Sequence, residues 1–444
     1  MPILTIEKTI NGGYGLTKTE EGQVVLVPGG LAGEELNIKL GAEKKGFRNG
    51  KIKTIQKPHP QRISPPCPYI KACGGCNLQH APKSLQNNIK TDIVKEALSR
   101  SRNQSLIDFA DKVLPCLSFV EEYGYRQRLR LHVIPYEGMG FRGHKSHDLV
   151  EIQRCILAKD EINAVLAELI DNNDHDTLCH HVEQLELLWN PSTKGVNLVY
   201  HLTRKPRATD VNCGKALGTS LENVERVFFI GKDFSRQPIY TTKNCEGATL
   251  QQRYTIVDKG QESPITLEWE IGGFCQVNLA QNKVMIEQAL TLLAVQPNES
   301  VLDLYCGMGN FSIPLAKNAH TLVGYEGQGS AIRSAKKNAQ INNLDNCTFF
   351  KRPVHKAVQE ILSENKTFDC LIIDPPRQGA PGLARNLSQL IKKRIVYISC
   401  DPATLGRDLA AIVAEGFTIE QVQPVDMFPQ THHIETIVLL KKDK

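Results

Sequence analysis

The stretch SVLDLYCGMGNFSIPLAKNA, residues 300–319, is an apolar run followed by a glycine-containing loop and then a run typical of a helix. The same alternation continues through HTLVGYEG and SAIRSAKKNAQINN, and the apolar runs CTFFKRPV, FDCLIIDPPRQG and RIVYISCD follow. Strands that alternate with helices form a parallel, doubly wound sheet. We therefore expect residues 266–444 to form an α/β, Rossmann-like domain.

The loop LYCGMGNFS predicts an adenosyl-binding site. Gly307 and Gly309 allow a tight turn and a close approach of the backbone to a ligand. Asp303 lies at the end of the first strand, and Glu326 lies at the end of the second, where a carboxylate can accept both ribose hydroxyls. A dinucleotide is the alternative, but the third glycine of its fingerprint would fall near Ser312, and Asp303 would repel a pyrophosphate. S-Adenosylmethionine has no phosphate and carries a sulfonium cation, so we expect that ligand.

Two further strand ends carry candidate reacting groups. Asp374 follows the apolar strand CLII, and Arg377 stands where methyltransferases that act on exocyclic amines have an aromatic residue. Cys400 ends the strand RIVYIS at the open edge of the sheet, where its thiol can be a nucleophile instead of a packing residue. Glu435 opens the final strand and is the candidate general base.

A Cys and Glu pair suits one particular reaction. Carbon 5 of uracil is too weak a nucleophile to accept a methyl group until a thiolate adds to C6, and the C5 proton must then be removed. Cys400 and Glu435 therefore predict methylation of C5 of a uridine. Formation of 5-methylcytosine is the alternative enzyme reaction, but it normally shows a Cys in the Pro-Pro motif, where this chain has Arg377. A non-catalytic RNA-binding or redox-sensing protein would not need these groups.

A second group of cysteines predicts a metal centre. Three thiols lie within CPYIKACGGCN, where two adjacent glycines let the chain wrap tightly, and a fourth lies in EIQRCILA. These residues are Cys67, Cys73, Cys76 and Cys155. Four thiolates suit Zn²⁺ or a [4Fe–4S] cluster, and the single C-x₂-C pair favours the cluster.

The rest of the chain predicts RNA-binding modules. Its 444 residues exceed what one hydrophobic core needs, and a net charge of +5 permits nucleic-acid binding without establishing it. Short apolar runs and glycine-rich turns over residues 1–58 favour a small five-stranded β-barrel, and residues 115–265 are typical of an α+β region. Arg126, Arg128 and Arg130 in YGYRQRLR are candidates for contacts with an RNA backbone.

The composition sets the remaining expectations. The chain has no apolar run long enough for a membrane span and no apparent signal peptide, so we expect a cytoplasmic protein without a membrane partner, and a monomer by default. Thirteen cysteines are many for that compartment, which argues for ligands or nucleophiles and against disulfides. Cys275 and Cys306 are expected to be packing residues.

Taken together, the motifs resemble the RNA 5-methyluridine methyltransferase family, which holds the bacterial ribosomal and transfer-RNA uracil-C5 enzymes. The matching stretches are CPYIKACGGCNLQH, YGYRQRLRL, GFRGHKSHDLVEIQRC, FCQVN, VLDLYCGMGNFSIPLA, IIDPPRQG, YISCDPATLGRDL and DMFPQTHHIE. Asp401 is a small departure, since the family more often has Cys-Asn-Pro at this point. An N-terminal barrel together with the cysteines is most like the branch that methylates 23S ribosomal RNA, and the transfer-RNA branch is the alternative.

The resemblance implies a role for each matching residue. It makes Cys400 the nucleophile, Glu435 the proton acceptor and the four clustered cysteines the ligands of [4Fe–4S]. It implies a cofactor site formed by Gln276, Asp303, Tyr305, Gly307, Gly309, Asn310, Glu326 and Asp374. It also implies a TRAM-like RNA-binding barrel over residues 1–58, a central iron–sulfur domain of residues 66–80 and 115–265, and a methyltransferase domain of residues 81–114 and 266–444.

Overall fold

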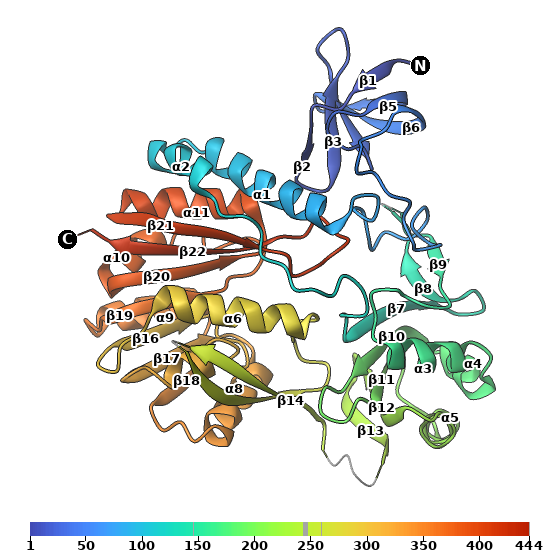
Figure 1. Cartoon of the computed structure of the whole chain (residues 1–444). Coiled ribbons are helices and arrows are strands. Elements are labelled where there is room, and N and C mark those ends of the chain that lie inside the picture. The colour runs from blue at the N-terminus through green and yellow to red at the C-terminus, as the bar shows by residue number, and fades with distance from the viewer. Residues whose placement is uncertain (145, 243–246, 259, 444) are drawn as a thin grey trace.

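The computed structural model describes residues 1–144, 146–242, 247–258 and 260–443. Three large β-sheets follow one another along the chain, and a two-stranded hairpin separates the second from the third (Figure 1). In this view the first sheet lies at the top, the second at the lower right and the third at the left. Within the described ranges, no helix has the length and apolar character needed to cross a membrane.

The first sheet has six strands where the sequence predicts five. They are β1 (Ile3–Thr5), β2 (Lys8–Ile10), β3 (Tyr14–Lys18), β4 (Val24–Pro28), β5 (Glu35–Lys44) and β6 (Phe47–Lys57), in the order β1-β5-β6-β4-β3-β2. The first apolar run divides because its backbone changes partner: the N–H of Ile6 donates to the carbonyl of Glu34, and that of Glu7 donates to Leu16. The run therefore supplies both edge strands of the sheet, β1 and β2. The sheet must curl to bring these edges together, as in a barrel.

The second sheet carries its helices as an α+β region does. Its strands are β7 (Arg128–Ile134), β8 (Gly138–Arg142), β9 (Leu149–Glu151), β10 (Val182–Trp189), β11 (Val196–Leu202), β12 (Val224–Gly231) and β13 (Phe234–Thr241), in the order β13-β12-β11-β10-β7-β8-β9. Only β11 and β12 are parallel in the part described, and α5 (Ala208–Ser220) supplies the crossover that such a pair needs. α3 (Asp160–Ile170) and α4 (Asn173–Cys179) also pack on this sheet.

The third sheet is the doubly wound one that the alternating pattern predicts. Its strands are β16 (Ser300–Leu304), β17 (Thr321–Glu326), β18 (Cys347–Lys351), β19 (Phe368–Ile373), β20 (Ile391–Ser399), β21 (Phe417–Val425) and β22 (Glu435–Lys442), in the order β18-β17-β16-β19-β20-β22-β21. The first five of these in space are parallel, and β22 runs antiparallel to both β20 and β21. The amino end of β22 therefore lies at the carboxyl edge of the parallel strands.

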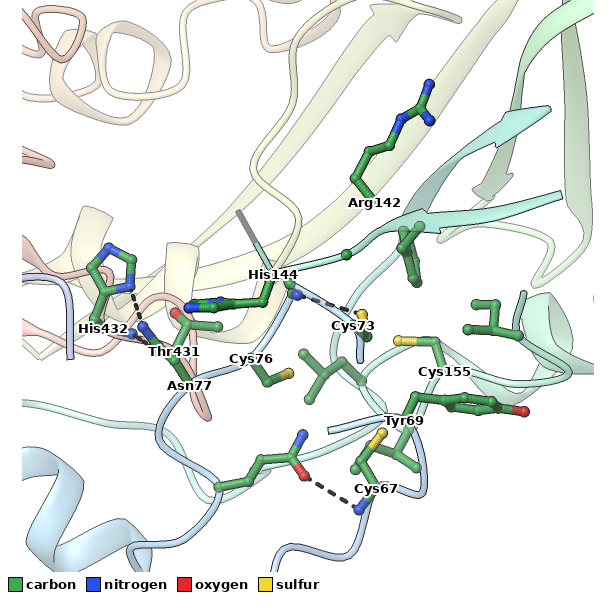
Figure 2. Close-up of a pocket in the computed structure, with 18 of the residues that line it drawn as sticks. Cys67, Tyr69, Cys73, Cys76, Asn77, Arg142, His144, Cys155, Thr431 and His432 are labelled. Atoms are coloured by element: carbon green, nitrogen blue, oxygen red, sulfur yellow. Dashed lines mark hydrogen bonds between the residues drawn. The ribbon is translucent and has the colours of Figure 1, made fainter. Parts of the chain in front are cut away.

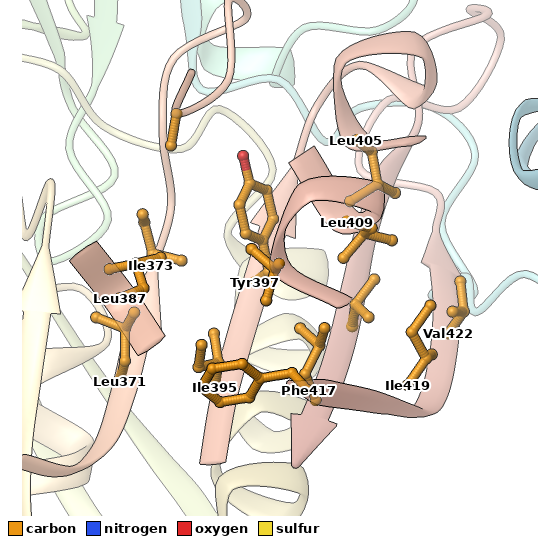
Figure 3. Close-up of a cluster of buried hydrophobic side chains, with 14 of the residues drawn as sticks. Leu371, Ile373, Leu387, Ile395, Tyr397, Leu405, Leu409, Phe417, Ile419 and Val422 are labelled. Atoms are coloured by element: carbon orange, nitrogen blue, oxygen red, sulfur yellow. The ribbon is translucent and has the colours of Figure 1, made fainter. Parts of the chain in front are cut away.

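Helices cover both faces of the third sheet. On one face α6 (Leu279–Leu293), α7 (Ser312–Ala316) and α8 (Gly329–Ile341) enclose a core that also receives the hairpin of β14 (Thr249–Asp258) and β15 (Gln261–Glu270). The other core takes side chains from α9 (Val354–Ser363), α10 (Ala384–Leu390) and α11 (Pro402–Ala414), and part of it is shown in Figure 3. Three helices from an earlier part of the chain also join this second core, although the second sheet lies between them and the third sheet in sequence. They are α1 (Lys83–Ser99), α2 (Gln104–Phe109) and the 3₁₀ helix η1 (Ala110–Lys112).

Candidate active site

The carboxyl edge of the third sheet gathers residues from four parallel strands. Glu326 ends β17, and Tyr305, Asp374 and Cys400 directly follow β16, β19 and β20. Because those strands are neighbours in the sheet, the four positions lie along one edge, where ligands bind in open α/β folds. Strand ends in the sequence predicted this arrangement for Glu326, Asp374 and Cys400, whereas Tyr305 was implied by the family resemblance.

Glu435 reaches the same edge from the opposite direction. β20 and β22 are antiparallel and pair Ser399 with Thr436, so Cys400 and Glu435 stand at the next position along the ladder. Burial, then Glu435 and Asp374, raise the pKa of the Cys400 thiol to about 12, while Arg377 lowers it. Burial also holds the pKa of Glu435 well above its usual range, and Asp374 adds to this effect.

Asp374 lies between the thiol and the loop after β16. Burial raises the pKa of its carboxyl to about 7. This carboxyl contributes to the raised pKa of both Cys400 and Glu435, and Arg377, three residues on, acts in the opposite sense on each. The edge therefore holds a concentration of acidic groups with one exposed guanidinium nearby, which suits a cationic or neutral ligand better than an anionic one.

A cavity of about 220 Å³ opens on Cys400. Its lining comes from four separate segments of the chain: Asn11, Gly12, Arg377, Cys400, Asp401, Pro402, His432, His433 and Ile434. The sequence alone predicted no role in this site for the turn at Asn11 and Gly12 or for the two histidines. The histidines lie within the motif DMFPQTHHIE, but nothing local in NGGYG indicates that the turn of the first sheet reaches a cavity of the third.

Asp401, the departure from Cys-Asn-Pro, has a local structural role. Its carboxylate accepts hydrogen bonds from the backbone N–H groups of Ala403 and Thr404, both at 2.9 Å. It is thus the N-cap of α11, with Pro402 at the first helical position. Asn caps helices equally well, so the substitution preserves the cap beside Cys400.

The glycine loop is shaped as a ligand-binding turn. Tyr305, Gly307 and Gly309 all have positive φ, of 65°, 55° and 88° respectively. A positive φ is costly for Tyr305, and such strain is typical of functional sites. The side chain of Asp303 is buried and accepts a hydrogen bond from the hydroxyl of Ser312, so it organises the start of α7 from below the loop. Burial raises its pKa to about 8.

Three other predicted cofactor contacts have protein partners. Asn310 and Asn282 exchange two amide hydrogen bonds, of 2.9 and 3.0 Å. Glu326 accepts from the backbone N–H of Gln328 at 2.8 Å, which leaves carboxylate lone pairs for a ligand. Gln276 uses its backbone carbonyl to accept from the Gln127 side chain at 2.7 Å, so its own amide is not consumed by that bond.

The four clustered cysteines line one cavity of about 570 Å³ (Figure 2). Burial raises the pKa of Cys73, of Cys155 and of Cys76, the last to about 12. The segments are tied together, since Cys73 forms a β-bridge with Gly143 and the hydroxyl of Tyr69 accepts a hydrogen bond from the N–H of Gln153 at 3.0 Å. In the ranges described, no group of three or more Cys, His, Asp or Glu side chains has an arrangement that could hold a metal ion.

Cys275 and Cys306 are buried in hydrophobic cores, as expected of packing residues.

The arginine-rich strand is more neutral than its sequence indicates. Arg128 and Arg130 both bind the buried carboxylate of Glu186, at 2.5 and 2.6 Å, and His201 approaches it at 2.9 Å. Arg130 remains half exposed, whereas Arg128 is largely covered. Arg126 lies instead at the cavity of the cysteines.

Comparison with known proteins agrees with this architecture. The family model described as tRNA (Uracil-5-)-methyltransferase matches residues 125–443. The 23S rRNA (uracil(1939)-C(5))-methyltransferase RlmD of Pectobacterium carotovorum is 33% identical over 97% of this chain and 92% of its own. The enzyme of the same name from Vibrio cholerae is 33% identical over 99% and 95%.

A solved structure among those compared has the same fold over nearly the whole chain. The Pyrococcus abyssi tRNA (uracil-54, C5)-methyltransferase, in complex with S-adenosyl-L-homocysteine, superposes with a TM-score of 0.70 at 22% identity and covers 98% of this chain and 100% of its own. The third sheet is thus a methyltransferase fold. With the matched family model and two full-length relatives, these findings show that the chain belongs to the tRNA (uracil-5-)-methyltransferase family.

Proposed function

We propose that this protein methylates C5 of a uridine in 23S ribosomal RNA, with S-adenosylmethionine as the methyl donor. The observation that carries the proposal is that Cys400, which directly follows β20 and lines a cavity, stands next to Glu435, the first residue of β22. The full-length relatives bear the name of a 23S rRNA enzyme, which favours ribosomal over transfer RNA. Transfer RNA is the alternative, since the family model is named for it.

Cys400 acts as the nucleophile. Its thiolate adds to C6 of the uracil, the C5=C6 electron pair moves toward C4, and C5 becomes able to take a methyl group. The Cys400 thiol, whose pKa burial raises, passes its proton to water as the C6–S bond forms. Glu435 then removes the C5 proton, and the C6–S bond breaks to restore the ring. A buried carboxyl with a raised pKa is suited to holding that proton.

The methyl donor fits the loop after β16. Tyr305, Gly307 and Gly309 hold the turn open, and Glu326 lies where the ribose hydroxyls would be accepted. Gln276 and Asp374 would contact the donor from the sides, while Asp303 and Asn310 support the loop through Ser312 and Asn282. Bound there, S-adenosylmethionine supplies an electrophilic methyl group next to Cys400.

The four cysteines fit a [4Fe–4S] cluster better than zinc. Each of the four irons takes one thiolate, so the ligands must surround a volume instead of converging on one point. Cys67, Cys73, Cys76 and Cys155 line one cavity, which supports a shared ligand set for such a group. No step of the reaction requires an electron, so the cluster would order the loop that borders the site.

We further propose the division into domains and the RNA contacts. Residues 1–58 would be a TRAM-like barrel, residues 66–80 and 115–265 the iron–sulfur domain, and residues 81–114 and 266–444 the methyltransferase domain. The packing of α1 into the core of the third sheet supports the last assignment. RNA would enter past the barrel turn at Asn11, and Arg126, Arg128 and Arg130 would contact its backbone. The protein would act as a cytoplasmic monomer.

Nucleoside mass spectrometry tests the proposal. Ribosomal and transfer RNA from cells that lack the gene are compared with RNA from cells complemented with the natural chain or Cys400→Ala. We expect 5-methyluridine to be lost from 23S RNA and restored by the natural chain alone. Loss of 5-methyluridine from transfer RNA would make transfer RNA the substrate, and loss of 5-methylcytosine would make cytosine the methylated base. No loss of a methylated nucleoside from either RNA would refute the proposal.

A further inference from the structure

The segment of residues 430–433 forms a wall between two cavities. It leads directly into β22 and Glu435. His432 and His433 line both the cavity at Cys400 and the cavity of the four cysteines, and Gly12 also lines both. A residue that fixes this segment from the side of the cysteines therefore acts on the wall of the Cys400 cavity.

Asn77, the residue after Cys76, is bonded to that wall. Its side-chain oxygen accepts from the backbone N–H of His432 at 2.9 Å, and its Nδ2 lies 2.8 Å from the Nδ1 of the same residue. Nδ2 also donates to the carbonyl of Gly12 at 2.9 Å. The backbone N–H groups of Asn77 and Leu78 both donate to the carbonyl of Gln430 at 3.1 Å. Figure 2 shows the amide between the two segments.

These bonds determine the protonation of the histidine. The backbone N–H of His432 can only donate and the carbonyl of Gly12 can only accept, so the amide of Asn77 has one possible orientation. Nδ2 must then donate to Nδ1 of His432, and Nδ1 carries no proton. The ring is therefore neutral, with its proton on Nε2.

Gly13, in the turn of the first sheet, packs closely against the side-chain amide of Asn77. A Cβ at Gly13 would lie 2.8 Å from Nδ2 and 3.0 Å from Cγ of Asn77. Gly13 also has a φ of 73°, a conformation that favours glycine. Any other residue at this position would keep the turn of the first sheet from approaching the amide of Asn77 so closely. Asn77 is consequently held between the barrel turn and His432.

Nε2 of His432 faces away from this contact. Across the described ranges, the only hydrogen bond of the His432 ring is at Nδ1, and Figure 2 places the second ring nitrogen on the side away from Asn77. His432 lines the Cys400 cavity, whereas Asn77 does not. A residue that lines the Cys400 cavity thus carries a neutral N–H on the side away from Asn77.

We propose that Asn77 is a positioning residue that holds His432 as its Nε2–H tautomer, so that this N–H donates to a carbonyl oxygen of the uracil. The inference rests on the proposed function. As the C6–S bond forms, the C5=C6 pair becomes the C4=C5 bond and the carbonyl pair moves onto O4. A fixed donor aimed at that oxygen stabilises the developing charge without reorganising.

Nitrogen-15 NMR of histidine-labelled protein tests the tautomer without RNA or methyl donor. His432→Gln identifies the signals of His432. We expect a proton on Nε2 in the natural chain and a mixture of tautomers in Asn77→Ala. Asn87→Ala is the matched control, because it removes an amide bond to Ser118 away from both cavities. A proton on Nδ1 of His432 in the natural chain overturns the inference while leaving the proposed function intact.

Trapping with RNA that carries 5-fluorouridine tests the role. A base cannot abstract the fluorine at C5 as it abstracts a proton. The covalent protein–RNA adduct therefore persists. We expect His432→Ala and His432→Asn to slow adduct formation about 10²-fold with little change in the Kd for RNA, since one oxyanion donor is lost. His432→Gln, whose amide can place a donor near Nε2, should recover most of that loss, and Asn77→Ala should lie between.

The outcomes separate the two claims. If His432→Ala forms the adduct as fast as the natural chain, the donor role is wrong. It is also wrong if His432→Gln and His432→Asn form the adduct at the same rate. The histidine variants change no residue of the cysteine loop and keep the backbone bond from His432 to Asn77, so they decide the matter even where Asn77→Ala misfolds. If the natural chain forms no adduct while Asn77 still sets the tautomer, the proposed function fails and the positioning contact stands.

Discussion

Cys400 and Glu435 lie side by side because β22 runs antiparallel to β20, one step beyond the pairing of Ser399 with Thr436. A parallel strand in that place would bring its carboxyl end to this edge and send Glu435 to the far one. The antiparallel strand therefore adds a carboxylate to an edge that already carries the glycine loop and Asp374. The two groups are independent in sequence and adjacent in space.

The pair should separate into two chemical roles. In Glu435→Gln, Cys400 should still add to C6 of the uracil, and C5 should still receive the methyl group. Removal of the C5 proton should be about 10²- to 10⁴-fold slower, because the general base is missing. A covalent protein–RNA complex should then accumulate with ordinary uridine, seen as a shifted band under denaturing conditions. Cys400→Ser should give no such band. Accumulation in neither variant, or turnover in Cys400→Ser, would contradict the assigned roles.

The charges around Cys400 should govern its reactivity in the unliganded protein. Glu435 and Asp374 raise the pKa of the thiol and Arg377 lowers it. At a fixed mildly alkaline pH, where Asp374 with its pKa of about 7 is ionised, Asp374→Asn should speed alkylation by iodoacetamide and Arg377→Gln should slow it, each by about three- to tenfold.

Cys347 provides the internal control for alkylation. Burial alone raises its pKa, also to about 12, so neither substitution should change its rate. Peptide mass spectrometry reports both thiols in one experiment. Equal changes at Cys347 and Cys400 would indicate a loosened structure instead of a local charge effect.

Glu186 should stabilise the second sheet in a pH-dependent way. Burial opposes its ionisation, but His201, Arg128 and Arg130 outweigh burial and bring the pKa to about 2. A carboxyl with a depressed pKa contributes stability above its unfolded pKa, and that stability is lost as the pH falls through the folded value. Glu186→Gln should therefore cost about 3 kcal/mol of unfolding free energy near neutrality, and the difference should shrink between pH 4.5 and 2.

Urea unfolding over a pH series measures this contribution. Glu183→Gln, on the same strand and exposed, is the control and should change little. If Arg128 and Arg130 contact RNA, Glu186→Gln should also steepen the salt dependence of RNA binding, because two guanidiniums lose their partner. A stability difference that stays constant with pH would contradict the ion-pair explanation.

Tyr397 should stabilise the core and the segment after Asp374. Its hydroxyl donates to Asp408 at 2.6 Å, and the same carboxylate oxygen accepts from the N–H of Ala380 at 2.7 Å. Tyr397→Phe should lower the free energy of unfolding by about 1–3 kcal/mol, because a buried charged acceptor loses a donor. Chemical denaturation checks this value. Tyr254→Phe is the control and should be nearly neutral, because its buried hydroxyl has no hydrogen-bond partner in the described part of the chain.

The sequence by itself determined the architecture of the third sheet and the edge that carries the site. Alternation of apolar runs with helical stretches specifies parallel strands, and the carboxyl ends of parallel strands share one edge, so the positions of Glu326, Asp374 and Cys400 followed from local pattern. Cys67, Cys73 and Cys76 are also close in sequence, whereas only the fold brings Cys155 to the same cavity.

Only the tertiary structure decided which side chains are already engaged. Arg128 and Arg130 look like free cations in sequence, yet Glu186 on the neighbouring strand β10 pairs with both. Asn77 and His432 are 355 residues apart and meet at 2.8 Å. Such contacts depend on how sheets and loops pack, and nothing in local propensity or periodicity encodes them. The sequence therefore indicated where chemistry could occur, and packing determined which groups are available for it.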